Sequence, residues 1–173
     1  GELISCTQRN DHDYFTLQIF DRNGKPSKAI PVPMQEKTII HDLQICGDWV
    51  VIFYPPGYHS PQDAMAGKDP FRWEGDKPAK VIAIKRDGSE IVEFESPSFF
   101  SWHFCNGYEQ DGKLIVDYIW LKQIPFAKDV NSGLEKQTRN MHRMTLDLKT
   151  KEVTDTKLSD IYCEFSKADE VRG

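Results

Sequence analysis

The sequence predicts an all-β fold made of consecutive four-stranded blades that form an arc of a β-propeller. Short apolar runs rich in β-branched and aromatic residues alternate with turns that contain Gly, Asp or Asn. The runs group into three blade-like units, at residues 1–35, 36–97 and 98–160, with the start of a further strand at 161–166. Units that recur at roughly 40 to 60 residues are typical of propeller blades, and a closed propeller has roughly four to eight of them. We therefore expect an arc of a larger ring.

The first unit contains three predicted strands, at residues 3–7, 14–20 and 29–32. Asn23-Gly24 lies between the last two strands, and Gly supplies the positive φ angle that a tight hairpin needs. The sequence therefore predicts a hairpin at this turn.

The second unit contains predicted strands at 38–45, 49–54, 80–84 and 90–94. The segment 55–78 between them is polar, contains Pro and Gly, and is longer than most connections in compact domains. We expect it to fold as a loop that packs on its own blade; a tunnel wall or a membrane-facing patch is the alternative.

The third unit contains predicted strands at 102–109, 114–120, 141–148 and 151–154. No convincing helix is expected anywhere in the chain. The best helical candidate, residues 127–137, is interrupted by Asn131-Ser132-Gly133.

Composition excludes several classes of protein. The 22 Lys and Arg residues are outnumbered by 27 Asp and Glu residues and alternate with them, which argues against a nucleic-acid surface. The longest apolar runs are too short to cross a bilayer, and the first residues do not resemble a signal peptide. Four widely spaced cysteines without a C-x-x-C pair predict free, buried thiols in a reducing compartment, so we expect a cytoplasmic protein.

Two of the five histidines are candidate metal ligands. His41 and His103 each fall in the predicted first strand of a unit, among apolar residues. First strands of blades line the propeller axis, so equivalent positions converge there, and neutral imidazoles suit Fe, Zn, Cu or Ni. The alternative is that each is a buried, hydrogen-bonded core residue. His12, His59 and His142 are expected to have surface or packing roles.

Other routes to catalysis have no signal in the chain. It contains no G-x-S-x-G elbow, Gly-rich phosphate loop, H-E-x-x-H motif or calcium loop. Cys105 follows His103 by two residues, which places both on one strand face without the geometry of a nucleophile and its base.

Segments around both histidines resemble motifs of the carotenoid cleavage oxygenases, the family that includes the retinal pigment epithelium isomerohydrolase. Residues 39–43 (IIHDL) resemble M-x-H-D-F, and residues 102–112 (WHFCNGYEQDG) resemble F-H-x-x-N-A-Y-E-x-x-G. Further matches follow in family order at 1–3 (GEL), 53–56 (FYPP), 70–73 (PFRW), 78–82 (PAKVI), 86–88 (RDG), 143–148 (RMTLDL), 158–160 (LSD) and 163–165 (CEF). The resemblance covers essentially the whole chain.

This resemblance implies a seven-bladed β-propeller that holds Fe(II) on its axis through four histidines. His41 and His103 match the second and third ligands, and Glu164 matches a glutamate that orients one of them. The first and fourth histidine motifs have no counterpart in residues 1–173. The chain also has Gly107 where the family has Ala, and Ser166 where it has Pro.

The leading hypothesis is a central fragment of a non-haem Fe(II) dioxygenase, inactive as an isolated chain. It implies an apolar polyene or apocarotenoid as substrate, cleaved at a conjugated double bond with O2, and no nucleic-acid partner. Cleavage of a stilbene-like alkene, or isomerisation, stays open. The alternative is a non-catalytic binding or assembly module without metal. Peripheral membrane contact of the parent protein and self-association through open sheet edges are further expectations.

Overall fold

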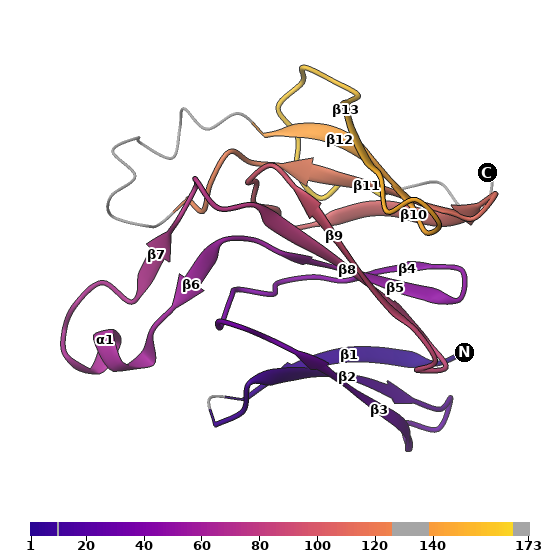
Figure 1. Ribbon diagram of the computed structural model, residues 1–173, viewed down its shortest axis with the longest axis horizontal. Helices are drawn as coiled ribbons and strands as arrows, with labels where there is room; N and C mark the ends of the chain where they lie inside the picture. The colour runs from indigo at the N-terminus through magenta and orange to yellow at the C-terminus, as the bar shows by residue number, and fades with distance from the viewer. Residues whose placement is uncertain (10, 126–138, 168–173) are drawn as a thin grey trace. The chain divides into compact units, whose positions relative to one another are not determined.

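The computed structural model describes residues 1–9, 11–125 and 139–167, whose regular secondary structure consists of β-strands and one short helix (Figure 1). Three antiparallel sheets of three, four and four strands follow one another along the chain. The predicted all-β class, with consecutive blade-like sheets, is confirmed. Each sheet lies within one of the predicted units, whose boundaries stay predictions. Residues 1–37 form one compact unit, and the described residues from Thr38 onward belong to a second.

The first sheet has the strand order β1-β2-β3, with β1 (Leu3–Gln8), β2 (Tyr14–Phe20) and β3 (Pro26–Pro33). Every second residue of β2 is buried, because alternate side chains of a strand point to one face. Asp21 stabilises the turn after β2: its Oδ1 accepts hydrogen bonds from the N–H groups of Asn23 (2.8 Å) and Lys25 (2.9 Å). Gly24 has a φ angle of 75°, so the predicted hairpin is present.

The second sheet has the order β4-β5-β8-β9, with β4 (Gln44–Cys46), β5 (Trp49–Tyr54), β8 (Ala79–Lys85) and β9 (Ile91–Ser96). All six residues of β5 are buried, whereas burial alternates along β9. An inner strand covered on both faces needs a continuous apolar run, and an outer strand with one solvated face needs alternation. The two sequence patterns therefore already distinguish the inner strand from the outer one.

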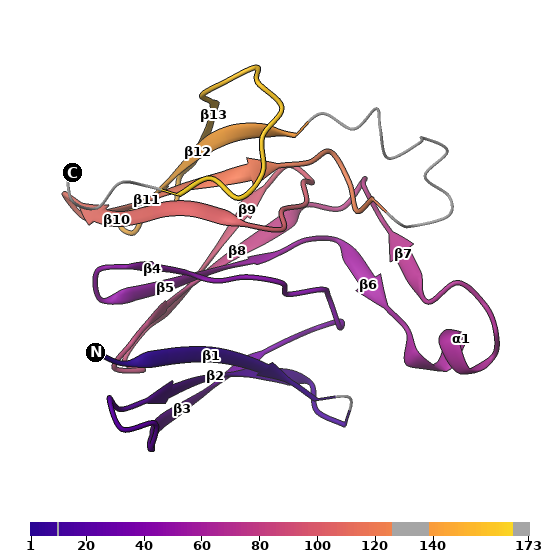
Figure 2. The same cartoon turned by 180° about the vertical axis from the view of Figure 1, so that it is seen from behind.

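The segment between β5 and β8 projects from the second sheet and contains β6 (Gly57–His59), α1 (Pro61–Met65) and β7 (Phe71–Trp73) (Figures 1 and 2). β6 and β7 pair with each other in antiparallel register. The prediction of no helix is wrong at α1, where the Ser60 hydroxyl accepts the Asp63 N–H (3.2 Å) and Pro61 occupies the first turn. A helix of five residues is too short for apolar periodicity to reveal it.

The prediction that residues 55–78 pack on their own blade is also wrong for two aromatic residues. Phe71 and Trp73 pack against a buried cluster contributed by the third unit. Within it, the Trp73 and Phe100 rings meet edge to face, with centroids 6.5 Å apart. Burying these large apolar surfaces favours the contact with the neighbouring unit.

The third sheet has the order β10-β11-β12-β13, with β10 (Phe104–Gln110), β11 (Lys113–Trp120), β12 (Asn140–Asp147) and β13 (Val153–Lys157). β10 is an edge strand, and its register with β11 shifts between Phe104 and Asn106. Between β11 and β12, the guanidinium of Arg143 donates two hydrogen bonds to the buried carboxylate of Asp117, at 2.7 and 2.9 Å. This bidentate geometry matches the planar fork of an arginine side chain.

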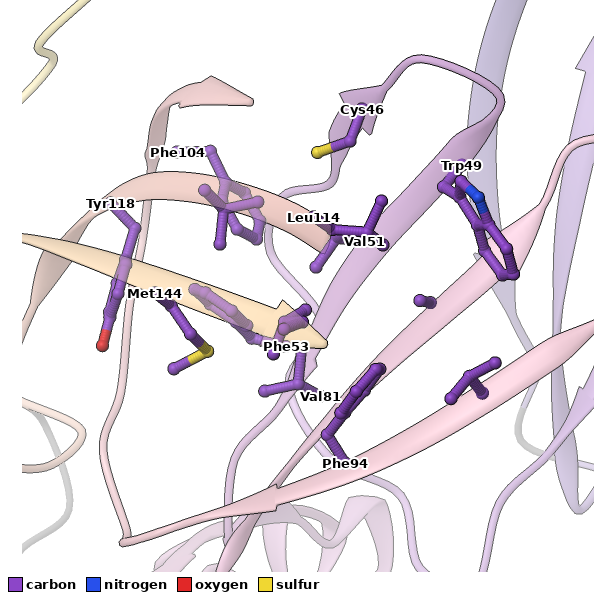
Figure 3. Packing of buried hydrophobic residues seen from close by; sticks show 14 of the residues in the cluster. Cys46, Trp49, Val51, Phe53, Val81, Phe94, Phe104, Leu114, Tyr118 and Met144 are labelled. Atoms are coloured by element: carbon purple, nitrogen blue, oxygen red, sulfur yellow. The ribbon is translucent and has the colours of Figure 1, made fainter. Parts of the chain in front are cut away.

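The main hydrophobic core fills the space between the second and third sheets (Figure 3). Phe53 of β5 lies at its centre, with its ring centroid 4.4 Å from that of Phe104 and 4.8 Å from those of Phe99 and Tyr118. Aromatic contacts at these distances add to the free energy gained by burying apolar surface. The start of β10 is therefore held firmly against β5.

Two predicted strands differ from the structure. Of the strand predicted at 38–45, only Gln44–Cys46 is present, because the preceding residues bond to the chain beyond β5. The Thr38 hydroxyl donates to the Pro55 carbonyl (2.6 Å), and the Ile39 N–H donates to the Gly57 carbonyl (3.2 Å). Residues 161–166, the predicted start of a further strand, contain no strand. The helical candidate at 127–137 lies outside the described residues.

Candidate metal centre

The structure brings the two predicted metal ligands together. His41 precedes β4 by three residues, and His103 comes directly before β10, so each stands at the start of the first strand of its sheet. Their imidazole centroids are 5.4 Å apart, with an interplanar angle of 78°. Histidines 62 positions apart in the sequence therefore share one site.

Neither histidine lies inside a strand, which corrects the sequence prediction. Residues 39–43 carry no strand, and Phe104 is the first residue of β10. His41 is exposed and His103 is half-buried, so neither is a buried core residue, which was the alternative reading of both. Side chains just outside a strand are free of the strict alternation of a pleated sheet, and both imidazoles can turn toward a common point.

Glu164 is the third predicted site residue, and it contacts His103. Its Oε2 lies 2.8 Å from Nδ1 of His103. A carboxylate only accepts hydrogen bonds, so this contact assigns the proton to Nδ1 and leaves the lone pair of Nε2 available. A carboxylate that fixes the tautomer and orientation of an imidazole in this way also raises its basicity as a metal ligand.

Arg139 holds Glu164 from the other side, a role that sequence reasoning missed. Its Nη1 donates to Oε1 of Glu164 (3.2 Å), and its guanidinium lies over the Tyr162 ring, 5.6 Å from the centroid. The Arg139 carbonyl also accepts the N–H of Cys163 (3.2 Å). Residues 162–164 are thus fastened to the start of β12 by three contacts. No local sequence pattern signals this link, because the partners lie 25 positions apart.

Two aromatic rings border the histidine pair. The Trp102 ring meets His41 edge to face, with centroids 4.7 Å apart. The Phe165 ring covers His103 at 4.4 Å, although 72% of the Phe165 residue surface is exposed. Phe165 also has a φ angle of 56°, which is uncommon for a bulky residue. The pair therefore has an apolar border on both sides.

Asp42 is a further residue of the site whose role sequence reasoning missed. Its Oδ2 accepts the backbone N–H of Phe104 (3.0 Å), and its Oδ1 accepts the N–H of Leu43 (2.9 Å). Two sequence signals could have pointed to it: its position next to His41, and its match to the D of the M-x-H-D-F segment.

The two imidazoles suit a metal ion whose coordination is completed by further ligands. Neutral imidazoles bind Fe, Zn, Cu or Ni. A carboxylate that is hydrogen-bonded to an imidazole, as Glu164 is to His103, is the usual arrangement for orienting a histidine that binds a metal. Within the described ranges, no group of three or more His, Cys, Asp or Glu side chains is arranged to hold a metal. These residues thus offer two imidazole ligands, His41 and His103.

Cys46 and Cys105 are buried thiols without nucleophilic character at neutral pH. All four are free thiols. Burial raises the pKa of Cys105 to about 11, and burial, with a smaller contribution from the charge of Glu109, raises that of Cys46 to about 12. At neutral pH both are therefore thiols rather than nucleophilic thiolates.

His142 and His59 have surroundings of their own. His142 stacks on Trp120, with centroids 5.4 Å apart, and its Nδ1 lies 3.0 Å from Oδ2 of Asp155. His59 is exposed at the end of β6. Among the described residues, no helix is long and apolar enough to cross a membrane.

Comparison with known proteins assigns the family. The family described as "RPE65: Retinal pigment epithelial membrane protein" matches residues 1–172. A carotenoid 9,10(9',10')-cleavage dioxygenase 1 from Phaseolus vulgaris is 23% identical over 98% of this chain, which corresponds to 33% of that protein. The chain thus spans about a third of the length of this curated relative.

Two solved structures have the same fold. The lignostilbene dioxygenase of Pseudomonas brassicacearum aligns with a TM-score of 0.87 and 24% identity over 98% of this chain and 38% of its own. Cobalt-substituted ACO from Synechocystis aligns with a TM-score of 0.76 and 23% identity over 94% of this chain and 36% of its own. Together with the match over residues 1–172, these comparisons establish that the chain belongs to the RPE65 family, to which carotenoid cleavage dioxygenases are related.

Proposed function

We propose that this chain is the central part of a non-haem Fe(II) dioxygenase that cleaves a conjugated double bond of a carotenoid or apocarotenoid with O2. The observation that carries the proposal is the histidine pair, with Glu164 bonded to one member. Membership of the RPE65 family and the carotenoid-cleaving relative support it. In the complete protein, ligands beyond those described would complete the coordination of the metal.

In this proposal, His41 and His103 hold the iron, and each supplies one imidazole nitrogen. Glu164 keeps the proton of His103 on Nδ1, so that the lone pair of Nε2 would be available to hold the metal. When bound, iron in such a site supplies the activation of dioxygen beside an alkene.

The apolar border gives the substrate a place to lie. Trp102 and Phe165 contact the two imidazoles, and Phe165 keeps most of its surface exposed. The conjugated hydrocarbon part of a polyene has no polar groups for orientation, so shape and apolar contact must position the double bond. An aromatic alkene would use the same contacts, and the lignostilbene dioxygenase among the related structures makes it the second substrate class to test.

The test is metal content per chain after anaerobic loading with Fe(II), measured by elemental analysis together with the mass of the protein in solution. We expect bound iron in the unaltered protein, its loss in His41→Ala and His103→Ala, and its retention in His59→Ala. His59 is an exposed histidine outside the pair, which makes it the matched control. Because the isolated chain is expected to be inactive, the iron-loaded complete protein is then incubated with an apocarotenoid or a stilbene under O2, and the aldehyde products are analysed.

Two results would contradict the proposal. Iron that persists in both His41→Ala and His103→Ala would place the metal elsewhere. Absence of iron from every variant, at any association state, would favour the alternative of a binding or assembly module without metal.

A further inference from the structure

Residues 102–104 contact the consecutive pair His41 and Asp42 three times. The Trp102 ring and the His103 ring each meet the His41 ring, with centroids 4.7 and 5.4 Å away. The third contact is the hydrogen bond from the Phe104 N–H to Oδ2 of Asp42 (3.0 Å). The two ring contacts are weakly directional, so the hydrogen bond is the contact that can fix the register of the two segments.

Both carboxylate oxygens of Asp42 accept hydrogen bonds. While Oδ2 accepts the N–H of Phe104, Oδ1 accepts the N–H of Leu43, its own neighbour (2.9 Å). The second bond fixes the Asp42 side chain against its own backbone, and the first ties that backbone to the start of β10. Hydrogen bonds to an ionised acceptor are stronger than those between neutral groups.

No pairing between the described strands links the segment of His41 and Asp42 to the start of β10. His41 and Asp42 lie outside the strands, and β10 is an edge strand whose other edge pairs with β11. The backbone N–H of Phe104 therefore meets a side chain, and that side chain belongs to the residue next to His41.

We propose that Asp42 is a positioning residue that sets the separation of His41 and His103, and thereby the affinity of the pair for a metal. The consequence for metal affinity rests on the proposed function, whereas the geometric role of Asp42 does not. Asp42 touches neither a metal nor a substrate in this role; it acts through the two backbone segments that carry the imidazoles.

The sharpest variant is Asp42→Asn, which has nearly the same shape. An amide has one acceptor oxygen, so its NH2 group must face one of the two N–H donors, and one hydrogen bond is replaced by a repulsive contact. Asp42→Ala removes both acceptors without that repulsion, and it serves if Asp42→Asn does not fold.

The matched control is Asp147→Ala. Oδ1 of Asp147 also accepts two backbone N–H groups, from Lys149 (2.9 Å) and Thr150 (2.8 Å), but both lie in its own turn. The loss of hydrogen bonds to two backbone N–H groups is therefore common to Asp42→Ala and Asp147→Ala. Asp147→Ala also removes an ion pair with Lys113 of β11 (3.7 Å), so what distinguishes the Asp42 variants is that they break the link between the segments that carry His41 and His103.

The experiment has two readouts on the purified protein. The first is the nuclear Overhauser effect between the ring protons of His41 and His103, measured without metal. The second is the dissociation constant for Co(II), from a titration followed by its visible spectrum. We expect both Asp42 variants to lose the ring-proton contact and to bind Co(II) roughly tenfold more weakly, and Asp147→Ala to match the unaltered protein in both.

The outcomes separate the two proposals. A ring-proton contact retained in folded Asp42→Asn or Asp42→Ala overturns the role of Asp42, as does an equal loss in Asp147→Ala. Loss of the contact in the Asp42 variants alone, in a protein that binds no Co(II), supports the positioning role and contradicts the proposed function instead.

Discussion

Oε2 of Glu164 lies 2.8 Å from Nδ1 of His103, while Oε1 of the same carboxylate accepts a hydrogen bond from Arg139. The carboxylate is only 13% exposed, so little water competes for its oxygens. The orientation of the His103 ring thus depends on a side chain 61 positions away, which is itself held by a third residue.

We predict that Glu164→Gln weakens Co(II) binding roughly tenfold, because a neutral amide is a poorer acceptor for the Nδ1 proton and loses the ion pair with Arg139. Titration with Co(II) measures the effect, and the nitrogen chemical shifts of the His103 ring report its tautomer. Glu93→Gln, which removes an exposed carboxylate paired with Lys80 at 2.7 Å, is the control. Equal affinities in the two variants would contradict the role of Glu164.

Gly107→Ala should destabilise the protein, although related sequences were expected to carry Ala at this position. A Cβ atom at Gly107 would lie 2.4 Å from Cγ of Gln44 and 2.7 Å from Sγ of Cys46. Overpacking of this kind costs about 1–3 kcal/mol of unfolding free energy. Urea denaturation measures the cost, and adding Gln44→Ala should recover part of it by removing the nearest atom. No change in stability on Gly107→Ala would mean that β4 and β10 move apart without strain.

The ion pair of Arg143 and Asp117 should contribute more than an exposed pair. Asp117 is 7% exposed, and Arg143→Met leaves its carboxylate without the bidentate partner. Because the arginine side chain is 41% exposed, we expect a loss of about 2–3 kcal/mol, below the full penalty for a completely buried charge. Urea denaturation measures the free energy of unfolding of each variant. Lys80→Met, which breaks a more exposed ion pair, should lower it by at most about 1 kcal/mol. The double variant Asp117→Asn, Arg143→Met should be more stable than Arg143→Met alone. Similar costs for Arg143→Met and Lys80→Met would refute this ranking.

Stability should fall in alkaline solution. The Cys46 thiol keeps its proton in the folded protein up to a pKa of about 12, against 9.0 for an ordinary thiol, chiefly because it is buried. Between these values the unfolded chain binds fewer protons than the folded one, so the free energy of unfolding decreases by about 1.4 kcal/mol per pH unit for this group. Burial also raises the pKa of Tyr118 above its ordinary value of 10.0, which adds to the decrease above that pH.

The measurement is urea denaturation at several pH values from 8 to 11. Stability should be flat below about pH 9 and fall above it, and Cys46→Ala should show a shallower fall. An identical slope in Cys46→Ala would show that another group controls the alkaline transition.

The sequence by itself determined most of the strands and several of the turns. Alternating burial in β2 and β9, the continuous apolar run of β5 and the glycines with positive φ in the turns all follow from residues that are neighbours in the chain. The choice of site candidates also came from sequence: His41 and His103 from their positions in two predicted first strands and from the family resemblance, and Glu164 from the resemblance alone. The local pattern placed His41 inside a strand, because the apolar residues at 38–45 predict a strand whichever partners their backbone groups bond to. It missed α1, because a helix of five residues is too short for apolar periodicity to reveal it.

Only the tertiary structure decided which of these residues meet. The bonds of Asp42 to Phe104 and of Arg139 to Glu164 join residues 62 and 25 positions apart. The first depends on how the segments before β4 and β10 lie together, and the second on where residues 162–164 return along β12. Such contacts depend on packing in three dimensions, and the spacing of residues along the chain does not predict them. The candidate residues of the site were thus predicted from the sequence, and their geometry came from the fold.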